Sequence, residues 1–331
     1  MEILPYKIAK ACTEALKNLQ TATISHAETQ CEGIGLNRQY DVDAPPLVDV
    51  LKDTWRPAKP ELTDTTCHVI KVQAKGIIIG FLSYFGCHPV VCCAPSRYVH
   101  GDFPAIATNN LEREIPGAIG LFLQGAQGDV NSCVVHKTEQ ESLLALDIIA
   151  GRYANAVRKG IADANALKIT GISSAIVEKN FTEMPIPLQE LKNMLAEKEK
   201  LVHRHDADDS DSGLRMATVY IQTLKKNIDL VSKGKPTYPK VKIQGLKIGP
   251  IALLGAPFEI FQAIKNDVKA SAKSKIPLVM GLTNECLGYA PDKQTAEGYA
   301  AKIVPMILGH MPFKKIHEEL VETLLELDGR L

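Results

Sequence analysis

The stretch FLSYFGCHPVVCCAPSRYVHGDFPAIATNNLEREIPGAIGLFLQGAQGDVNS (81–132) decides the fold. It opens with an apolar run that predicts a buried strand. That strand ends at a Cys-His-Pro tripeptide, because the proline lacks a backbone donor and restrains His88 away from helical conformations. A second apolar run at 118–123 predicts another buried strand, which ends in QGAQGDVN (124–131). Two adjacent strands therefore deliver polar side chains to loops at one side of a sheet, where chemistry is common on such scaffolds.

Four polar residues follow these strands: His88, Asp102, Asp129 and Asn131. Asp102 stands in a Gly-Asp-Phe-Pro turn, and a helix is expected to begin near its proline. We expect the loops that carry the four residues to converge. A lone histidine after a strand is commonly a hydrogen-bonded structural residue, so the residues alone leave a structural and a metal-binding interpretation open.

The remaining chain alternates strands and helices without a strict βαβ rhythm. Helical spacing of apolar residues predicts helices at 8–19, 139–164, 188–200, 214–233, 258–272 and 313–327. Two-residue alternation and apolar runs predict strands at 21–29, 169–181 and 276–282, and hairpins at 67–84 and 239–254. No internal repeat or linker divides the chain. We therefore predict a mixed α/β (α+β) fold in which a layered mixed sheet is flanked by helices, as one domain over 1–331.

Composition excludes several classes of protein. The 38 basic and 38 acidic residues balance among 331, which argues against a nucleic-acid partner. No apolar run approaches the roughly 20 residues of a membrane-spanning helix, and the first residues lack a signal-peptide pattern. Eight cysteines without a CxxC pair predict neither a disulfide scaffold nor a cysteine-rich zinc site. These features favour a reducing compartment, and we expect a cytoplasmic protein without an integral membrane segment.

Four further residues, outside the 81–132 stretch, lie in short segments that bear on function. Glu259 ends Leu-Gly-Ala-Pro-Phe-Glu, Tyr289 lies in Cys-Leu-Gly-Tyr-Ala-Pro, Tyr299 lies in Glu-Gly-Tyr-Ala, and Arg38 lies in Leu-Asn-Arg-Gln. Taken alone, Glu259 is interpreted as a first-turn carboxylate that favours the helix dipole. The tyrosines are ordinary packing residues, and the arginine is a surface charge.

Taken together and in order, these segments resemble the neutral/alkaline non-lysosomal ceramidase family. The resemblance runs from about Ile8 to Leu308 and rests on CHP, GDFP, LFLQGAQGDVN and the four segments just described. It implies zinc ligands at His88, Glu259 and Tyr289, catalytic residues at Tyr299, Arg38 and Asn131, and substrate-binding residues at Asp102 and Asp129.

The implied activity is hydrolysis of an amide (N-acyl) bond in a small-molecule substrate by zinc-activated water. The chemistry is coherent, because zinc accepts imidazole nitrogen and carboxylate oxygen and lowers the pKa of bound water. Tyrosine and arginine side chains stabilise a developing oxyanion. Two alternatives remain open. In the first alternative, the chain is a non-catalytic relative or fragment that binds a ligand or partner. In the second, it is a different metallohydrolase whose site is completed by His100 or His136.

The chain departs from the family pattern in three places. The family's first zinc-binding histidine lies in a Thr-His-Thr-His-Ser-Gly-Pro-like motif, which this sequence lacks. The helix at 8–19 resembles the one that follows that motif, so we expect an N-terminal truncation or an incomplete metal centre. We also expect the chain to lack the C-terminal immunoglobulin-like domain of ceramidases. Finally, Asn131 takes the place of the serine in the family's Gly-Asp-x-Ser-Pro. An amide cannot be a nucleophile but can donate a hydrogen bond, so we expect a substrate smaller or more polar than ceramide.

Overall fold

The computed structural model describes residues 3–41, 45–92 and 98–331, so residues 93–97 of the 81–132 stretch lie outside it. The larger sheet has the order β5-β4-β3-β1-β7. Its strands are β1 (Thr23–Gln30), β3 (Thr66–Ala74), β4 (Ile77–Phe85), β5 (Ile119–Gln124) and β7 (Asn165–Ala166). Strands β4 and β5 are parallel neighbours, paired from Gly80↔Ile119 to Phe85↔Gln124. The predicted adjacency of these two strands is therefore confirmed.

The second sheet has the order β12-β10-β9-β8, in which only β10 and β12 are parallel. Its strands are β8 (Ile172–Lys179), β9 (Val241–Ile248), β10 (Ile251–Gly255) and β12 (Ile276–Met280). Two short pairs complete the strands of the described chain: antiparallel β2 (Gly35–Asn37) with β6 (Val130–Ser132), and parallel β11 (Glu259–Ile260) with β13 (Tyr289–Ala290). These short pairs lie among the loops beyond the strand ends.

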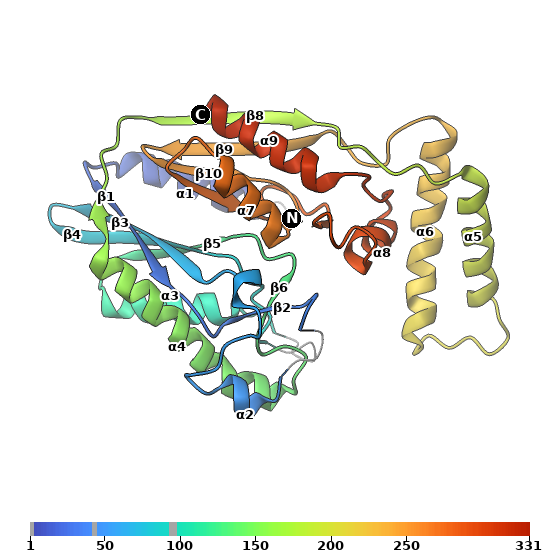
Figure 1. Cartoon of the computed structure of the whole chain (residues 1–331), viewed down its shortest axis with the longest axis horizontal. Helices are drawn as coiled ribbons and strands as arrows, with labels where there is room; N and C mark the ends of the chain where they lie inside the picture. Colours follow the sequence, from blue (N-terminus) through green and yellow to red (C-terminus); the bar gives the residue numbers. More distant parts are fainter. Residues whose placement is uncertain (1–2, 42–44, 93–97) are drawn as a thin grey trace.

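The two sheets stack between two layers of helices (Figure 1). Buried Ile70 and Tyr84 of the first sheet pack against Ile251 and Leu278 of the second. Helices α3 (Asp102–Glu114) and α4 (Glu139–Asp163) share a core with the outer face of the first sheet. Helices α7 (Gln262–Ser271) and α9 (Ile316–Arg330) do the same for the second sheet. The predicted mixed α/β fold class is confirmed.

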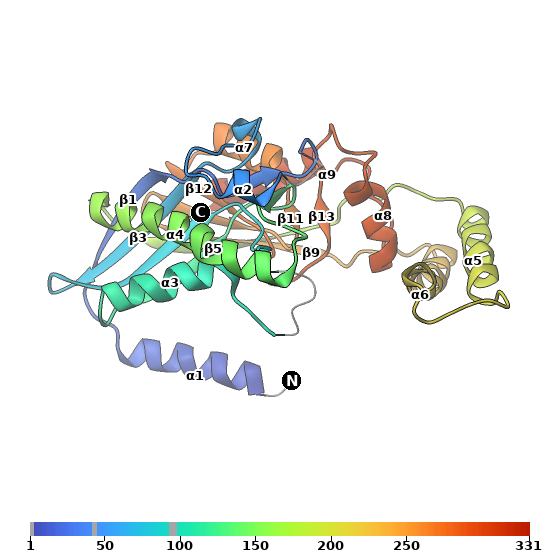
Figure 2. The same cartoon turned by 90° about the horizontal axis from the view of Figure 1, so that it is seen from below.

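Several helices lie outside this stack. Helices α5 (Leu188–Val202) and α6 (Ser212–Ser232) form a hairpin that projects from the body, with α8 (Tyr299–Leu308) beside α6 (Figure 1). Helix α1 (Ile3–Lys17) has no buried residue and lies apart from the sheets in Figure 2. The connection before β3 holds the short helices α2 (Leu47–Val50) and η1 (Pro60–Leu62). No helix in the described ranges has the length and apolar character needed to cross a bilayer.

Three local predictions are wrong. The helix predicted at 258–272 is divided, because Glu259 lies in β11 and α7 begins only at Gln262. The backbone of Glu259 donates to the Gly288 carbonyl at 2.9 Å, so strand pairing replaces the helical turn. Asp102 opens α3 instead of lying in a loop. Asn131 lies in β6, where it faces Leu36, and not in a loop.

The contact between the sheets yields a stability test. The Tyr84 hydroxyl donates to the Val279 carbonyl at 2.8 Å, and the Tyr84 side chain is buried. We expect Tyr84→Phe to lower the free energy of unfolding by about 1–2 kcal/mol, because it leaves a buried carbonyl without this donor. Urea unfolding measures the change, with exposed Tyr6→Phe as the matched control. Equal stability of the two variants would contradict the prediction.

Candidate functional site

His88 stands just beyond β4 and is fixed by one carbonyl group. Its backbone N–H donates to the Val130 carbonyl at 2.9 Å, and its ring Nδ1 faces the same oxygen at 3.2 Å. The other ring nitrogen, Nε2, lies 2.6 Å from Glu259 Oε2. Both side chains are largely buried, at 15% and 18% exposure. The predicted convergence of these two residues is therefore present.

Glu259 and Tyr289 are held side by side by the short parallel pair β11 and β13. The two residues are register partners, so their side chains leave the pair in the same direction. The pKa of the Tyr289 hydroxyl responds to both Arg38 and Glu259, so all three side chains are close. His88, Glu259 and Tyr289 thus form one group, which we call the strand-end cluster.

Arg38 joins the strand-end cluster from the end of β2. Its guanidinium carbon lies 4.9 Å from the centre of the Tyr289 ring, and its Nη2 donates to the Gly128 carbonyl at 2.5 Å. Burial raises the pKa of Tyr289, the nearby guanidinium opposes this rise, and Glu259 adds to it. Arg38 therefore lies beside Tyr289, where the residue type alone predicted a surface charge, and its catalytic role stays a prediction.

Asp129 connects the segments that carry the site. Its carboxylate accepts from the Gln262 backbone at 2.9 Å and from Asn37 Nδ2 at 3.0 Å, while its own carbonyl accepts from the Arg38 backbone at 2.9 Å. Burial raises the pKa of Asp129 to about 6, although these hydrogen bonds oppose the shift. Because both carboxylate oxygens are engaged by the chain, the structure gives Asp129 a positioning role.

Asp102 also positions the chain. Its carboxylate accepts from the backbone N–H groups of Val91, Cys92 and Phe103, at 3.3, 2.7 and 2.8 Å. It adopts a φ of +56° and is 3% exposed. This buried carboxylate therefore fixes the segment that follows His88, and the substrate-binding role expected for it stays a prediction.

Two residues that were predicted to be catalytic, Asn131 and Tyr299, are not members of the strand-end cluster as defined above. Asn131 is half-buried in β6, where alternation places it on the side opposite buried Val130 and Ser132. The Ser132 hydroxyl bonds within the chain to Val134, so it does not replace the family's serine. Tyr299 begins α8 with 65% of its surface exposed. The structure does not bring Tyr299 to the strand-end cluster, and its catalytic role stays a prediction.

The third hypothesis, a site completed by His100 or His136, gains no support. Both side chains are exposed. The Nδ1 of His100 accepts a hydrogen bond from the Asp102 backbone at 2.8 Å, which gives it a local structural role. Across the described ranges, neither histidine belongs to a group of three or more His, Cys, Asp or Glu ligand atoms.

The donor atoms of the strand-end cluster are of the types that bind zinc, but the 2.6 Å between His88 Nε2 and Glu259 Oε2 is a hydrogen-bond distance, so an ion would have to part the two side chains. A neutral imidazole carries one N–H, yet both ring nitrogens of His88 face oxygen acceptors. A metal ion between Nε2 and Glu259 would leave the ring N–H on Nδ1, where it faces the Val130 carbonyl. Imidazole nitrogen and carboxylate oxygen are zinc ligands, and a zinc-bound histidine typically donates its other N–H to a carbonyl such as that of Val130.

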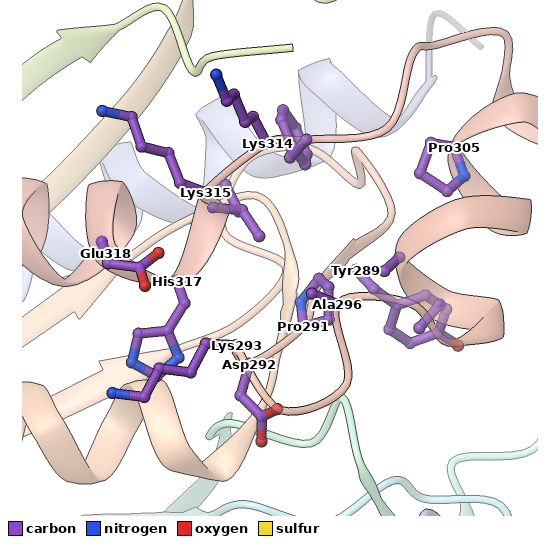
Figure 3. Close-up of a pocket in the computed structure, with 14 residues that line it drawn as sticks. Tyr289, Pro291, Asp292, Lys293, Ala296, Pro305, Lys314, Lys315, His317 and Glu318 are labelled. Atoms are coloured by element: carbon purple, nitrogen blue, oxygen red, sulfur yellow. The ribbon is translucent and has the colours of Figure 1, made fainter. Parts of the chain in front are cut away.

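A pocket of about 210 Å³ adjoins this site and is bordered by Tyr289. In Figure 3, Tyr289 and Pro305 lie on one side of it, with His317 and Lys293 across from them and Asp292 between. Lysine and carboxylate groups therefore share the lining with apolar side chains. Such a pocket accepts a ligand that carries polar groups of its own.

Sequence reasoning missed a second group of metal-ligating side chains. His26 and Glu28 of β1 and His68 of β3 offer ligand atoms that all lie within 4.8 Å of one another. We call this group the cross-strand cluster. The available signal was the His-x-Glu spacing in a predicted strand, which places both side chains on one face. The pairing with His68 was not visible, because it depends on the register of two strands that are distant in the sequence.

Comparison with known proteins identifies the fold. No family model and none of the curated proteins matches the chain. The structure of neutral ceramidase from Pseudomonas aeruginosa matches with a TM-score of 0.66 and 16% identity over 98% of this chain and 55% of that one. A ceramidase complexed with C2 matches with a TM-score of 0.63 and 16% identity, over 96% and 54%. The chain therefore has the fold of these ceramidases, and it spans about half of their length.

The buried Asp129 predicts a pH-dependent stability. A folded-state pKa of about 6, above the usual 3.8, means that the folded protein binds the extra proton between these values. The contribution of Asp129 to folding is therefore greatest below pH 4 and declines as the pH rises to 6. We expect Asp129→Asn to remove this decline, which amounts to about 3 kcal/mol at most.

Urea unfolding of the wild type and of Asp129→Asn at several pH values between 4 and 7 measures the difference. Exposed Asp209→Asn serves as the matched control. If the free-energy difference between the wild type and Asp129→Asn does not change with pH, the raised pKa is ruled out.

Proposed function

We propose that the chain is a zinc-dependent hydrolase-like protein that cleaves an amide bond in a small N-acyl substrate. The observation that carries this proposal is the 2.6 Å contact between His88 Nε2 and Glu259 Oε2, with Tyr289 paired beside Glu259. The likeness to two ceramidase structures supports the same reaction class. When bound, zinc supplies an activated water molecule and polarises a carbonyl group.

Two backbone carbonyl groups orient the side chains that this reaction would use. The Val130 carbonyl orients the His88 ring so that Nε2 faces Glu259. The Gly128 carbonyl anchors the Arg38 guanidinium over the Tyr289 ring. Arg38 therefore adds a fixed positive charge that stabilises an oxyanion developing nearby.

The substrate we propose is more polar or shorter than ceramide. Asn131 offers an amide N–H for a hydrogen bond to a carbonyl, and it cannot act as a nucleophile. The pocket beside Tyr289 places the charged residues Asp292, Lys293, Lys314 and Lys315 along its lining. Charged groups disfavour a long acyl chain, because they would lose hydration without gaining partners.

A ligand substitution tests the reaction. We expect His88→Ala and Glu259→Gln to lower kcat/KM for short-chain N-acyl substrates by at least about a hundredfold, since even outer partners of a metal ligand contribute 10–100-fold. Exposed Glu285→Gln is the matched control and should retain the wild-type rate. The measurement is amide hydrolysis by the zinc-supplemented chain. Turnover that survives both ligand substitutions would exclude the proposed centre.

A substrate panel separates the remaining possibilities. We expect faster hydrolysis of short-chain N-acyl amides than of ceramide, and a fall of about a hundredfold in kcat for Asn131→Ala if its amide donates to the oxyanion. Efficient ceramide cleavage that survives Asn131→Ala would refute the substrate assignment. A wild-type chain that cleaves no member of the panel would favour the alternative, a binding protein that retains the fold.

A further inference from the structure

The cross-strand cluster is built by the register of the larger sheet. Strands β1 and β3 are antiparallel, and Glu28 lies directly opposite His68. His26 lies two residues before Glu28, so both side chains leave β1 on the same face. Facing residues of an antiparallel pair have Cβ atoms about 5 Å apart, within reach of a shared ligand. Three metal-ligating side chains therefore meet on hydrogen-bonded strands.

Two of the three separations between ligand atoms are close to those around a zinc ion. His26 Nε2 lies 3.2 Å from His68 Nδ1, and His68 Nδ1 lies 3.7 Å from Glu28 Oε1. Zinc bonds of about 2.0–2.2 Å in a tetrahedron place neighbouring ligand atoms about 3.3–3.6 Å apart. All three ligand atoms lie within 4.8 Å of one another, so a rotation of the half-exposed Glu28 side chain would complete the set without movement of the backbone.

Hydrogen bonding alone leaves this arrangement incomplete. One N–H between the two imidazoles accounts for the His26–His68 contact, but 3.7 Å is too long for a hydrogen bond from His68 to Glu28. The Glu28 side chain is 50% exposed, so solvent hydrates its carboxylate when no ion is bound. A cation among the three atoms would bind this carboxylate and one nitrogen of each ring at once.

Charged side chains of both signs surround the cross-strand cluster. Lys265 and Lys269 of α7 contribute positive charge, which opposes a cation. Buried Asp64 lies 3.3 Å from Lys265 and offsets part of that opposition.

We propose that His26, Glu28 and His68 bind one zinc ion at a second site, separate from the strand-end cluster. Two histidines and one glutamate are a known three-ligand set for zinc, in which the fourth position is left open. The His68 side chain is 6% exposed while that of Glu28 is 50% exposed, so the open position is on the solvent side of the cluster. No residue of this site belongs to the proposed catalytic centre.

Cobalt titration of the untagged, full chain carrying His88→Ala tests the second site, because that substitution disables the strand-end cluster. We expect one equivalent of Co²⁺ to bind with the visible absorption of a low-coordinate site, and Zn²⁺ to displace it. Adding His26→Ala should weaken binding by about tenfold or more, since even outer partners of a metal ligand contribute that much. Glu28→Gln should act in the same direction, because it keeps the shape of the side chain and removes its charge.

Exposed His205→Ala in the same background is the matched control and should leave the titration unchanged. Circular dichroism of each variant shows whether the fold is retained, and the half-exposed position of Glu28 makes Glu28→Gln the variant least disruptive to folding. The proposal is overturned if the His88→Ala chain binds no Co²⁺. It is equally overturned if folded Glu28→Gln and His26→Ala chains bind the ion as well as their parent does.

Discussion

The Gly128 turn and strand β11 meet through their backbones, and the geometry of the site depends on this contact. A Cβ atom at residue 128 would lie 2.4 Å from the Glu259 carbonyl oxygen, so only glycine fits there. The Gly128 N–H donates to the Ile260 carbonyl at 2.8 Å. Two residues after Gly128, the Val130 carbonyl orients His88. The backbone positions of His88 and Glu259 relative to each other are therefore set by peptide groups of both halves of the chain.

Periodicity predicted the layers and the position of His88, because long strands carry a clear apolar pattern. It could not predict β11 and β13, since two-residue strands have no period, and Glu259 was placed in a helix for that reason. Only the ordered resemblance brought Glu259 and Tyr289 together. Asp102 shows another limit, because a sequence does not reveal that backbone N–H groups engage both of its carboxylate oxygens.

The two metal-ligating groups differ in how they are supported. The residues of the cross-strand cluster lie on two paired strands, and the register of this pair fixes their Cα positions relative to one another. The strand-end cluster collects its members from loops and short strands beyond the sheet, where a substrate has access and the backbone is not confined by a continuous ladder. Rigid support suits an ion that is held permanently, whereas the loop-borne group suits chemistry that must admit and release a substrate.

Opposing charges act on the Tyr289 hydroxyl. Burial and the Glu259 carboxylate favour the neutral phenol, and the Arg38 guanidinium favours the phenolate. Without a metal, burial dominates and the pKa of Tyr289 stays above its usual value. A dication held by His88 and Glu259 would neutralise the carboxylate and act on the phenol in the same direction as Arg38. Arg38 over the ring therefore favours the anionic form of Tyr289 whether or not a metal ion is present.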